Sequence, residues 1–441
     1  MKNDSGFFQE LLSGIFARKR KFKNIIDERP LVELCDALIA ERGEISSINI
    51  ATMILNKYRL SSKQEKLQFF TALATNFDLD ANKVVITAKN YQTDNSAKNL
   101  TALRNASEPR RMELFRRLNQ VPGATEQLVS MRADLLNFLP ENPDFKKNDV
   151  DMERLFTSWF NRGFLVLRHI DWSTSADILE KIISYEAVHE ISDWDDLRRR
   201  LQPSDRRCFA FFHPSMPTEP LIFVEVALCD GIASSIQKLL QEDRKILNEN
   251  ETRTAVFYSI SNCQRGLKGV SFGNFLIKQV AKDLSASLPN LNTFVTLSPV
   301  PTFMRWLGDE AKAKPNSSIA DFHTLISDMN ADALSLQNED FQNIALNIAS
   351  YYFLKVKRAD LQPVDPVTRF HLGNGASLKQ LNWLGDISDK GLKQSAGLMV
   401  NYHYDLAEVE ARHEAYAHDY EVTAVKEIQV RSEKSNSEVT G

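Results

Sequence analysis

The sequence TAVFYSI at residues 254–260 combines aromatic and β-branched side chains in a nearly continuous apolar run. This composition predicts a central strand of a sheet that is covered on both faces. A glycine-rich turn follows, then an amphipathic segment over residues 272–284 and a second apolar run, TFVTL, at 293–297. A strand, a turn, a helix and a strand in this order predict a βαβ-like unit. This part of the chain therefore indicates an α/β domain.

The same domain extends in both directions from this unit. Two upstream runs, CFAFF at 208–212 and LIFVEVAL at 221–228, predict neighbouring strands. Residues 309–357 have helical character, as expected of an insertion or a lid. We place the domain at residues 151–431. From residue 432 onward the chain is polar and short of apolar side chains, so we expect a disordered tail at 432–441.

Residues 1–150 have a different pattern. In LVELCDALI at 31–39, apolar side chains recur at helical spacing, and similar periodicity occurs at 65–77 and 126–138. Breaks such as VPGA at 121–124 separate these segments. We therefore predict an α+β protein of two domains, in which an all-α helical bundle precedes a domain with a mixed central sheet and a helical insertion.

Charge and cysteine usage limit the classes of function. The net charge of −4 gives no basic field that would attract nucleic acid, and the basic run at 17–23 is explained by a solvated helix face or a subunit contact. Cys35, Cys208, Cys229 and Cys263 are scattered, which is typical of reduced intracellular thiols. No apolar stretch approaches the roughly 20 residues of a membrane span, and the first residues resemble no secretory signal. We expect a cytoplasmic protein without membrane or nucleic-acid partners.

The turn QRGLKGVSFGN at 264–274 lies between a predicted strand and a predicted helix. Glycines allow a ligand to approach the backbone, and the amino end of a helix favours a phosphate. The turn lacks the Gly-Lys-Ser/Thr ending of a Walker A loop, and its spacing is loosely similar to the pyrophosphate turn of GNAT-type acyl-CoA transferases. An ordinary strand-to-helix turn remains the alternative.

Two side chains outside the turn are candidates for chemistry. Ser298 follows the strand at 293–297, and a side chain at the carboxyl end of such a strand can face a ligand. His371 lies in FHLGNGA at 370–376, whose glycines and asparagine predict a tight loop, and a loop histidine can act as a general acid near neutral pH. A serine that begins a turn and a structural histidine are the alternatives. Since His413 and His418 are five residues apart on a predicted helix, and no metal-type Cys/His set occurs, we predict no metal site.

These segments together resemble the malonyl-CoA decarboxylase family. The blocks that carry the resemblance keep the family's order and are HPSMPTEPL at 213–221, FYSIS at 257–261, GLKGVSFGN at 266–274 running into FLIK, LSPVP at 297–301, FHLGNGA at 370–376 and GLMVNYHY at 397–404. The resemblance implies a catalytic domain of GNAT type at 151–431. It also implies that the helical domain at 1–150 mediates self-association into a dimer or tetramer.

The resemblance also implies roles for individual residues. Ser298 and His371 match the family's catalytic serine and histidine, and Ser259 and Tyr404 match positions that line its active site. The malonyl-CoA-binding segment corresponds to Lys268, Gly269, Val270, Ser271, Phe272, Gly273 and Asn274. Some members carry a glutamate where this chain has Ser271, so a role for that carboxylate does not transfer.

The chemistry implied is the decarboxylation of malonyl-CoA to acetyl-CoA and CO2. The thioester carbonyl β to the carboxylate accepts the electrons, so we expect neither a metal nor an organic cofactor. His371 would protonate the resulting enolate, and Ser298 would act as a proton acceptor or as an orienting hydrogen bond. The alternatives are a GNAT-type acyltransferase and a catalytically inactive acyl-CoA-binding protein. Whether methylmalonyl-CoA is also a substrate stays open, because one methyl group is rarely rejected by more than about 1–3 kcal/mol.

Overall fold

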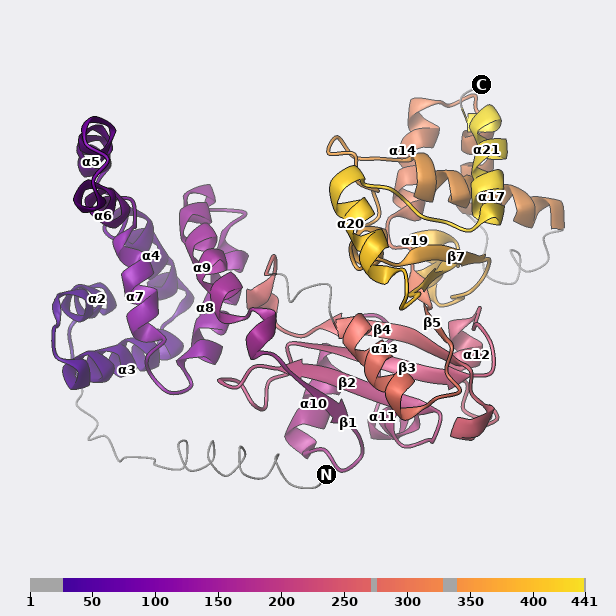
Figure 1. Ribbon diagram of the computed structural model, residues 1–441, viewed down its shortest axis with the longest axis horizontal. Helices are drawn as coiled ribbons and strands as arrows, with labels where there is room; N and C mark the ends of the chain where they lie inside the picture. The colour runs from indigo at the N-terminus through magenta and orange to yellow at the C-terminus, as the bar shows by residue number, and fades with distance from the viewer. Residues whose placement is uncertain (1–26, 271–275, 328–338, 440–441) are drawn as a thin grey trace. The chain divides into compact units, whose positions relative to one another are not determined.

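The computed structural model describes residues 27–270, 276–327 and 339–439 (Figure 1). The chain divides into two compact units. The first, here called the helical unit, runs to Asn161 and also includes Pro214–Pro217 and Gln264–Val270. The second, called the sheet unit, contains the remainder. No helix among the described residues is long and apolar enough to cross a membrane.

The helical unit confirms the prediction of an all-α amino-terminal part. Local signals explain where several helices begin; for example, Ser62 and Glu65 form a reciprocal capping box at the start of α4. The unit continues through α9, so it ends after Asn161 rather than at residue 150. Its helices are α2 (Leu31–Ala40), α3 (Glu44–Leu60), α4 (Lys63–Thr75), α5 (Ala81–Thr93), α6 (Ala97–Ala106), α7 (Arg110–Leu118), α8 (Ala124–Phe138) and α9 (Lys146–Trp159).

The sheet unit is built on a mixed sheet with the strand order β1-β2-β3-β4-β5-β8-β6, and β7 pairs with β8. The βαβ prediction is confirmed, because β4 and β5 run parallel on either side of α13 (Leu276–Ser287) in the chain. The other pairings between the named strands are antiparallel. The strands are β1 (Val166–Ile170), β2 (Arg206–Phe212), β3 (Ile222–Cys229), β4 (Thr254–Asn262), β5 (Thr293–Thr296), β6 (Ser298–Pro299), β7 (Ser377–Asn382) and β8 (Met399–His403).

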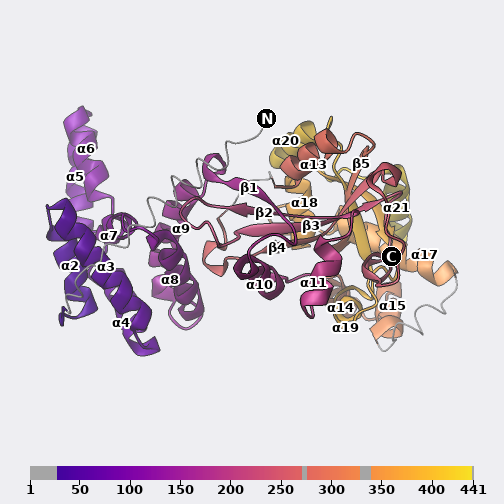
Figure 2. The same ribbon diagram turned by 90° about the horizontal axis from the view of Figure 1, so that it is seen from below.

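Helices cover both faces of this sheet, which explains the continuous apolar strands. Helix α13 packs on one face, against side chains such as Val224 and Phe257. On the other face lie α10 (Ala176–Tyr185), α11 (Trp194–Leu201) and α12 (Ile236–Leu240). Figure 2 shows α13 on one side of β1–β4, with α10 and α11 on the other. Because strands β2 and β3 are buried on both faces, their sequences do not alternate between apolar and polar residues.

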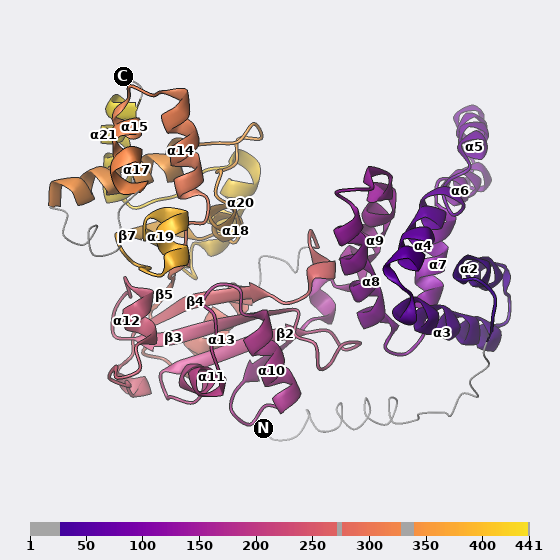
Figure 3. The same ribbon diagram turned by 180° about the vertical axis from the view of Figure 1, so that it is seen from behind.

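The helical insertion is also confirmed. It consists of α14 (Phe303–Ala313), α15 (Ser318–Ser327) and α17 (Glu339–Lys355), which lie between β6 and β7 in the chain. Helices α18 (Pro366–Gly373), α19 (Asp389–Ser395) and α20 (Val409–Asp419) complete this end of the unit with α21 (Lys426–Val439). Figure 3 shows α14, α15, α17 and α21 gathered together.

The expected disordered tail at 432–441 is wrong over most of its length, because α21 continues to Val439. Ile428, Ser432 and Ser435 are buried and recur at helical spacing. Arg431 donates to the side-chain oxygen of Asn343 on α17 at 3.1 Å. Beyond Ile428, the buried face of α21 thus contains serines instead of large apolar residues, so the composition of this segment resembled that of a disordered tail.

Candidate active site

Ser298 lies just after the end of strand β5, where the chain continues into the short strand β6. Strand β5 ends at Thr296, and Ser298 then pairs with Val400 of β8 as part of the short strand β6. Its side chain is buried, with 5% of its surface exposed. The strand end predicted from the sequence therefore directs this hydroxyl into the interior of the sheet unit.

His371 belongs to helix α18, so the prediction of a loop was wrong. Asp365 caps this helix, since its Oδ1 accepts from the backbone N–H groups of Val367 and Thr368, and Pro366 occupies the first helical position. The glycines that suggested a loop mark the end of the helix. The helix brings His371 Nε2 to 3.0 Å from Ser298 Oγ.

The hydrogen bonds around this pair define which nitrogen of the imidazole carries the hydrogen. The Ser298 hydroxyl donates to Thr296 Oγ1 at 2.8 Å, so its only hydrogen is used there. Ser298 Oγ must then accept from His371 Nε2–H. In a neutral imidazole the other nitrogen has a free lone pair, so Nδ1 accepts from the Tyr404 hydroxyl, 2.8 Å away. The geometry thus presents Nε2 of His371 as a hydrogen donor.

Burial keeps this imidazole neutral. Only 2% of the surface of His371 is exposed, and its ring stacks on Tyr402 with ring centres 4.4 Å apart. Burial lowers the pKa of His371 to about 3, because the charged ring would lose its hydration. Tyr402 is itself fixed by Thr368, since their hydroxyl oxygens are 2.8 Å apart. A neutral ring held on both nitrogens is suited to deliver a proton from one defined atom.

We expect this buried ring to make folding stability depend on pH. An unfolded histidine takes up a proton near pH 6.5, whereas the folded ring does so only at about pH 3. The stabilisation is therefore complete above pH 6.5 and is lost progressively as the pH falls toward 3. The unfolding free energy of the unmodified protein should fall as the pH is lowered from 7 to 5. In His371→Asn this fall should be smaller by about 2 kcal/mol.

Urea unfolding at the two pH values, followed by tryptophan fluorescence, measures this difference. His418→Asn is the matched control, because it makes the same substitution at an imidazole that is 77% exposed. An identical loss of stability in His371→Asn and in the unmodified protein would show that His371 is not held neutral.

The Ser298–His371 pair opens into a cavity of about 240 Å³ within the sheet unit. Its wall is mainly apolar, with Ser298, His371 and Asn262 supplying polar side chains. The lining residues are Val188, Phe257, Tyr258, Ile260, Asn262, Ser298, Pro299, Pro366, Val367, Phe370 and His371. An apolar space with a few converging polar groups is typical of a small-molecule site.

Strand β4 forms one wall of the cavity and has an irregular register there. Its pairing with β3 shifts between Glu225 and Val226, so Tyr258 has no partner across the two strands. Its parallel pairing with β5 covers only Thr254 to Phe257, although β4 continues to Asn262. The last residues of β4 thus extend past the end of β5, beside the cavity.

Ser259 is not among the residues that line this cavity, although the sequence placed it in the active site. Its hydroxyl donates to Glu186 Oε2 at 2.6 Å and lies 3.4 Å from the Ser261 hydroxyl. Tyr404, by contrast, contacts His371 directly. The structure therefore brings together three of the predicted side chains, Ser298, His371 and Tyr404, and gives Ser259 a different environment.

The turn predicted to bind phosphates is only partly described. Ser271, Phe272, Gly273 and Asn274 lie outside the described residues. The part that is described, Gln264–Val270, belongs to the helical unit.

Packing explains one glycine of this turn. A Cβ atom on Gly266 would lie 1.9 Å from the carbonyl oxygen of Val129 in α8, so only glycine fits there. Arg132 of the same helix donates to the carbonyl oxygens of Gly266 and Lys268, at 2.9 and 2.8 Å. Gly269 has a φ of 85°, which glycine adopts without strain.

Three residues that fix the site were not identified from the sequence. Thr296 Oγ1 accepts hydrogen bonds from the Ser298 hydroxyl and from the backbone N–H of Tyr402. The ring of Tyr402 stacks on His371. Asp365 caps helix α18, which contains His371. Asp365-Pro366 is a helix-start signal that could have been recognised. The contacts of Tyr402 with Thr296 and His371 join distant parts of the chain, so no local signal reveals them. Within the described ranges, no three His, Cys, Asp or Glu side chains are grouped to hold a metal ion.

Comparison with known proteins gives matches along most of the chain. A family model described as the malonyl-CoA decarboxylase C-terminal domain matches residues 163–440, and its N-terminal counterpart matches residues 77–160. A goose protein (Anser anser anser) named malonyl-CoA decarboxylase, mitochondrial, is 32% identical over 405 residues, which cover 84% of this chain and 80% of the goose protein. A rat protein (Rattus norvegicus) of the same name is 34% identical over 354 residues, covering 74% of this chain and 72% of the rat protein.

Solved structures are similar over nearly the full length. The malonyl-CoA decarboxylase of Rhodopseudomonas palustris is 47% identical with a TM-score of 0.86, and the match covers 91% of this chain and 98% of that protein. The malonyl-CoA decarboxylase of Agrobacterium vitis is 48% identical with a TM-score of 0.87, covering 91% and 99%.

Proposed function

The chain belongs to the malonyl-CoA decarboxylase family, and from this premise we propose that it converts malonyl-CoA to acetyl-CoA and CO2. The observation that carries the proposal is the pair of Ser298 Oγ and His371 Nε2, 3.0 Å apart at the wall of a mainly apolar cavity. Such a cavity can take the acyl end of a thioester and exclude much of the water around it.

The reaction needs little beyond orientation and a proton. When the carboxylate of malonyl-CoA leaves as CO2, the bonding electrons move into the thioester carbonyl and form an enolate. The carbon between the two carbonyls must then gain one proton to become the methyl group of acetyl-CoA. An enzyme accelerates such a step by holding the breaking bond perpendicular to the thioester plane and by stabilising the oxyanion.

In this proposal Ser298 orients the carboxylate. Its hydroxyl donates to Thr296 in the structure and would turn to donate to the malonyl carboxylate. His371 then donates its Nε2 proton to the enolate carbon. A neutral imidazole can serve as the proton donor in a dry site. Tyr404, which donates to Nδ1, stabilises the charge that the ring takes on, and a proton from solvent later restores the ring.

Two other parts of the chain would bind the coenzyme A phosphates and the enolate oxygen. The turn from Lys268 to Asn274 precedes α13, and we expect it to bind the phosphates of coenzyme A. Backbone N–H groups at the end of β4, beyond its pairing with β5, are candidates to stabilise the enolate oxygen. One such preorganised donor typically contributes about 3 kcal/mol to the transition state.

The experiment that tests this function uses the full chain with malonyl-CoA labelled in its free carboxyl group, in the presence of a chelator. We expect stoichiometric release of labelled CO2 and acetyl-CoA with no acceptor added. The acyltransferase alternative predicts free coenzyme A that appears only when an amine acceptor is present. The inactive alternative predicts binding of malonyl-CoA without either product, and either of these results would contradict the proposal.

Two further expectations belong to the proposal. The helical unit would mediate self-association into a dimer or tetramer, which is supported by large apolar side chains on its surface, such as Ile45 and Leu60, 77% and 80% exposed. The protein would act in the cytoplasm, where its free cysteines would remain reduced.

A further inference from the structure

One segment beside the cavity has no regular secondary structure. Residues 186–190, here called the strap, connect α10 to the residues before α11. Val188 of the strap lines the cavity that contains Ser298 and His371. Among the described lining residues, Val188 alone lies outside a helix or strand; the others belong to β4, β6 and α18. The position of this part of the wall therefore depends on what holds the strap.

The first attachment of the strap is to β4. Ser259 donates to Glu186 Oε2 at 2.6 Å, and Ser261 Oγ accepts from the Ala187 backbone N–H at 3.2 Å. The other oxygen of Glu186 accepts from the backbone N–H groups of Val188 and His189, at 2.7 and 2.9 Å. One carboxylate thus joins the sheet to the turn that contains Val188.

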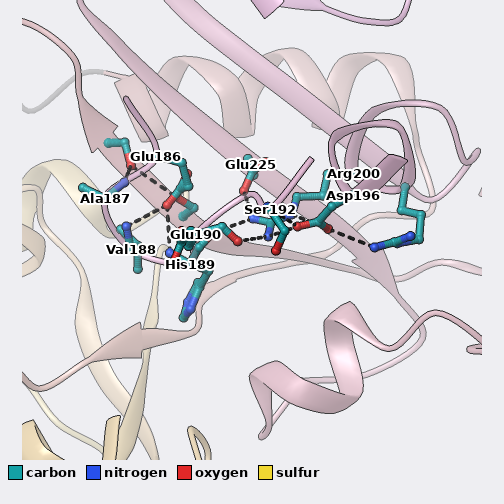
Figure 4. A network of polar contacts seen from close by, with 12 residues as sticks. Glu186, Ala187, Val188, His189, Glu190, Ser192, Asp196, Arg200 and Glu225 are labelled. Carbon is teal, nitrogen blue, oxygen red and sulfur yellow. Dashed lines mark hydrogen bonds and ion pairs between the residues drawn. The ribbon is translucent and has the colours of Figure 1, made fainter. Parts of the chain in front are cut away.

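The second attachment is Arg200 of α11 (Figure 4). Its two terminal nitrogens donate to the carbonyl oxygens of His189 and Glu190, each at 2.8 Å. The guanidinium is itself held by Asp196 at 3.0 Å and Glu225 at 3.3 Å, and only 3% of its side chain is exposed. A buried, charge-assisted set of bonds of this kind fixes a backbone more firmly than surface ion pairs do.

The third attachment comes from α19. Lys390 Nζ donates to the carbonyl oxygens of Ala187 and Val188, at 2.8 and 3.1 Å. The strap is therefore bonded to a strand and two helices, although it forms no helix or strand of its own. Surface turns are ordinarily mobile, whereas these attachments hold the strap in one conformation. This difference indicates that its position matters for function.

We propose that the strap sets the acyl specificity of the cavity. Val188 limits the size of the substituent on the carbon between the two carbonyls, and Ser259, Glu186, Arg200 and Lys390 are positioning residues that hold Val188 in place. This inference rests on the proposed decarboxylation. It gives Ser259 an indirect role, through Glu186 and the strap, in place of direct contact with the substrate.

The size of the cavity and the known effect of one methyl group support a role of Val188 in specificity. A cavity of about 240 Å³ is smaller than the roughly 300–1,000 Å³ usual for small-molecule pockets, so side chains of its wall lie close to a bound acyl group. A single methyl group in an apolar pocket changes discrimination by about 10- to 200-fold. Val188→Ala removes two methyl groups from the wall, so it makes room for a methyl substituent on the substrate.

The test compares malonyl-CoA with methylmalonyl-CoA as substrates of the full chain. We expect Val188→Ala to raise the ratio of kcat/KM for methylmalonyl-CoA to that for malonyl-CoA by about tenfold or more. Val188→Phe should lower that ratio. Val166→Ala is the matched control, since Val166 lies exposed on β1 and its loss should leave the ratio unchanged. A ratio within about twofold of the unmodified protein in Val188→Ala would overturn the inference.

The positioning residues are tested by the same ratio. Lys390→Met and Ser259→Ala should raise the ratio of kcat/KM for methylmalonyl-CoA to that for malonyl-CoA, as Val188→Ala does. Ser259→Thr keeps the hydroxyl and should leave the ratio at the value of the unmodified protein. A merely structural role would lower kcat/KM for both thioesters by the same factor and leave the ratio constant, which would contradict this part of the inference. If the unmodified protein releases CO2 from neither thioester, the proposed function fails too, so the two failures are distinguishable.

Discussion

His371→Asn is expected to reduce the formation of acetyl-CoA by about 100- to 10,000-fold, while malonyl-CoA still binds. Asparagine has a similar size and polarity, but it cannot supply the Nε2 proton that faces Ser298 at 3.0 Å. Because binding uses the coenzyme A portion of the substrate, the loss should appear in kcat with little change in the dissociation constant. Steady-state release of CO2 and equilibrium binding of malonyl-CoA measure the two quantities.

His418→Asn serves as the control for this prediction, since that imidazole is exposed on α20 and does not contact the cavity. Its turnover should equal that of the unmodified protein. Retention of more than about a tenth of the original kcat in His371→Asn would exclude this histidine as the proton donor.

Ser298→Ala is expected to lower kcat by about 100- to 1,000-fold. The substitution removes the hydroxyl that would orient the malonyl carboxylate, and it also leaves His371 Nε2–H without its acceptor. Unlike His371→Asn, it should raise the dissociation constant of malonyl-CoA more than that of acetyl-CoA, because acetyl-CoA has no carboxylate to hold. Ser395→Ala is a suitable control, as Ser395 is a buried serine whose hydroxyl bonds only within its own region, to Gly391 and Leu398.

A serine 3.0 Å from a histidine also occurs in enzymes that form an acyl-serine, so the two chemistries must be separated. In this site the Ser298 hydroxyl donates to Thr296, and His371 Nε2 faces it with a hydrogen and not with a lone pair. The imidazole is therefore not oriented to act as a base toward the serine. Rapid acid quenching with acyl-labelled malonyl-CoA should leave no label on the protein; labelled Ser298 would contradict the orienting role.

The sequence predicted the architecture well where local composition decides it. The apolar run at 254–260 and the segment after it did form the parallel pair β4 and β5 joined by α13. Two predictions failed, the first because a local helix-start signal was missed and the second because the decisive contacts are tertiary. Glycines near His371 suggested a loop, yet Asp365 starts a helix that those glycines end. Serines in α21 suggested disorder, yet Ser432 and Ser435 are buried.

The candidate site was predictable in its main residues but not in their arrangement. Ser298, His371 and Tyr404 were assigned by resemblance, and their hydrogen bonds join segments more than thirty residues apart in the sequence. The strap was not anticipated, because its attachments through Arg200 and Lys390 depend on tertiary contacts that no periodicity reveals. Gly266 lies in the turn whose glycines were interpreted as allowing a ligand to approach the backbone, whereas close packing on α8 is sufficient to require glycine there.

The central claim is that His371 protonates the substrate carbon inside the cavity that it shares with Ser298. A crystal structure of the full chain with sulfoacetyl-CoA, in which a sulfonate replaces the carboxylate that would leave, tests this most directly. We predict that the carbon between the carbonyl and the sulfonate lies about 3–3.5 Å from His371 Nε2, with the sulfonate accepting from Ser298. If the acyl group is bound away from both side chains, the assignment of this cavity as the catalytic site is wrong.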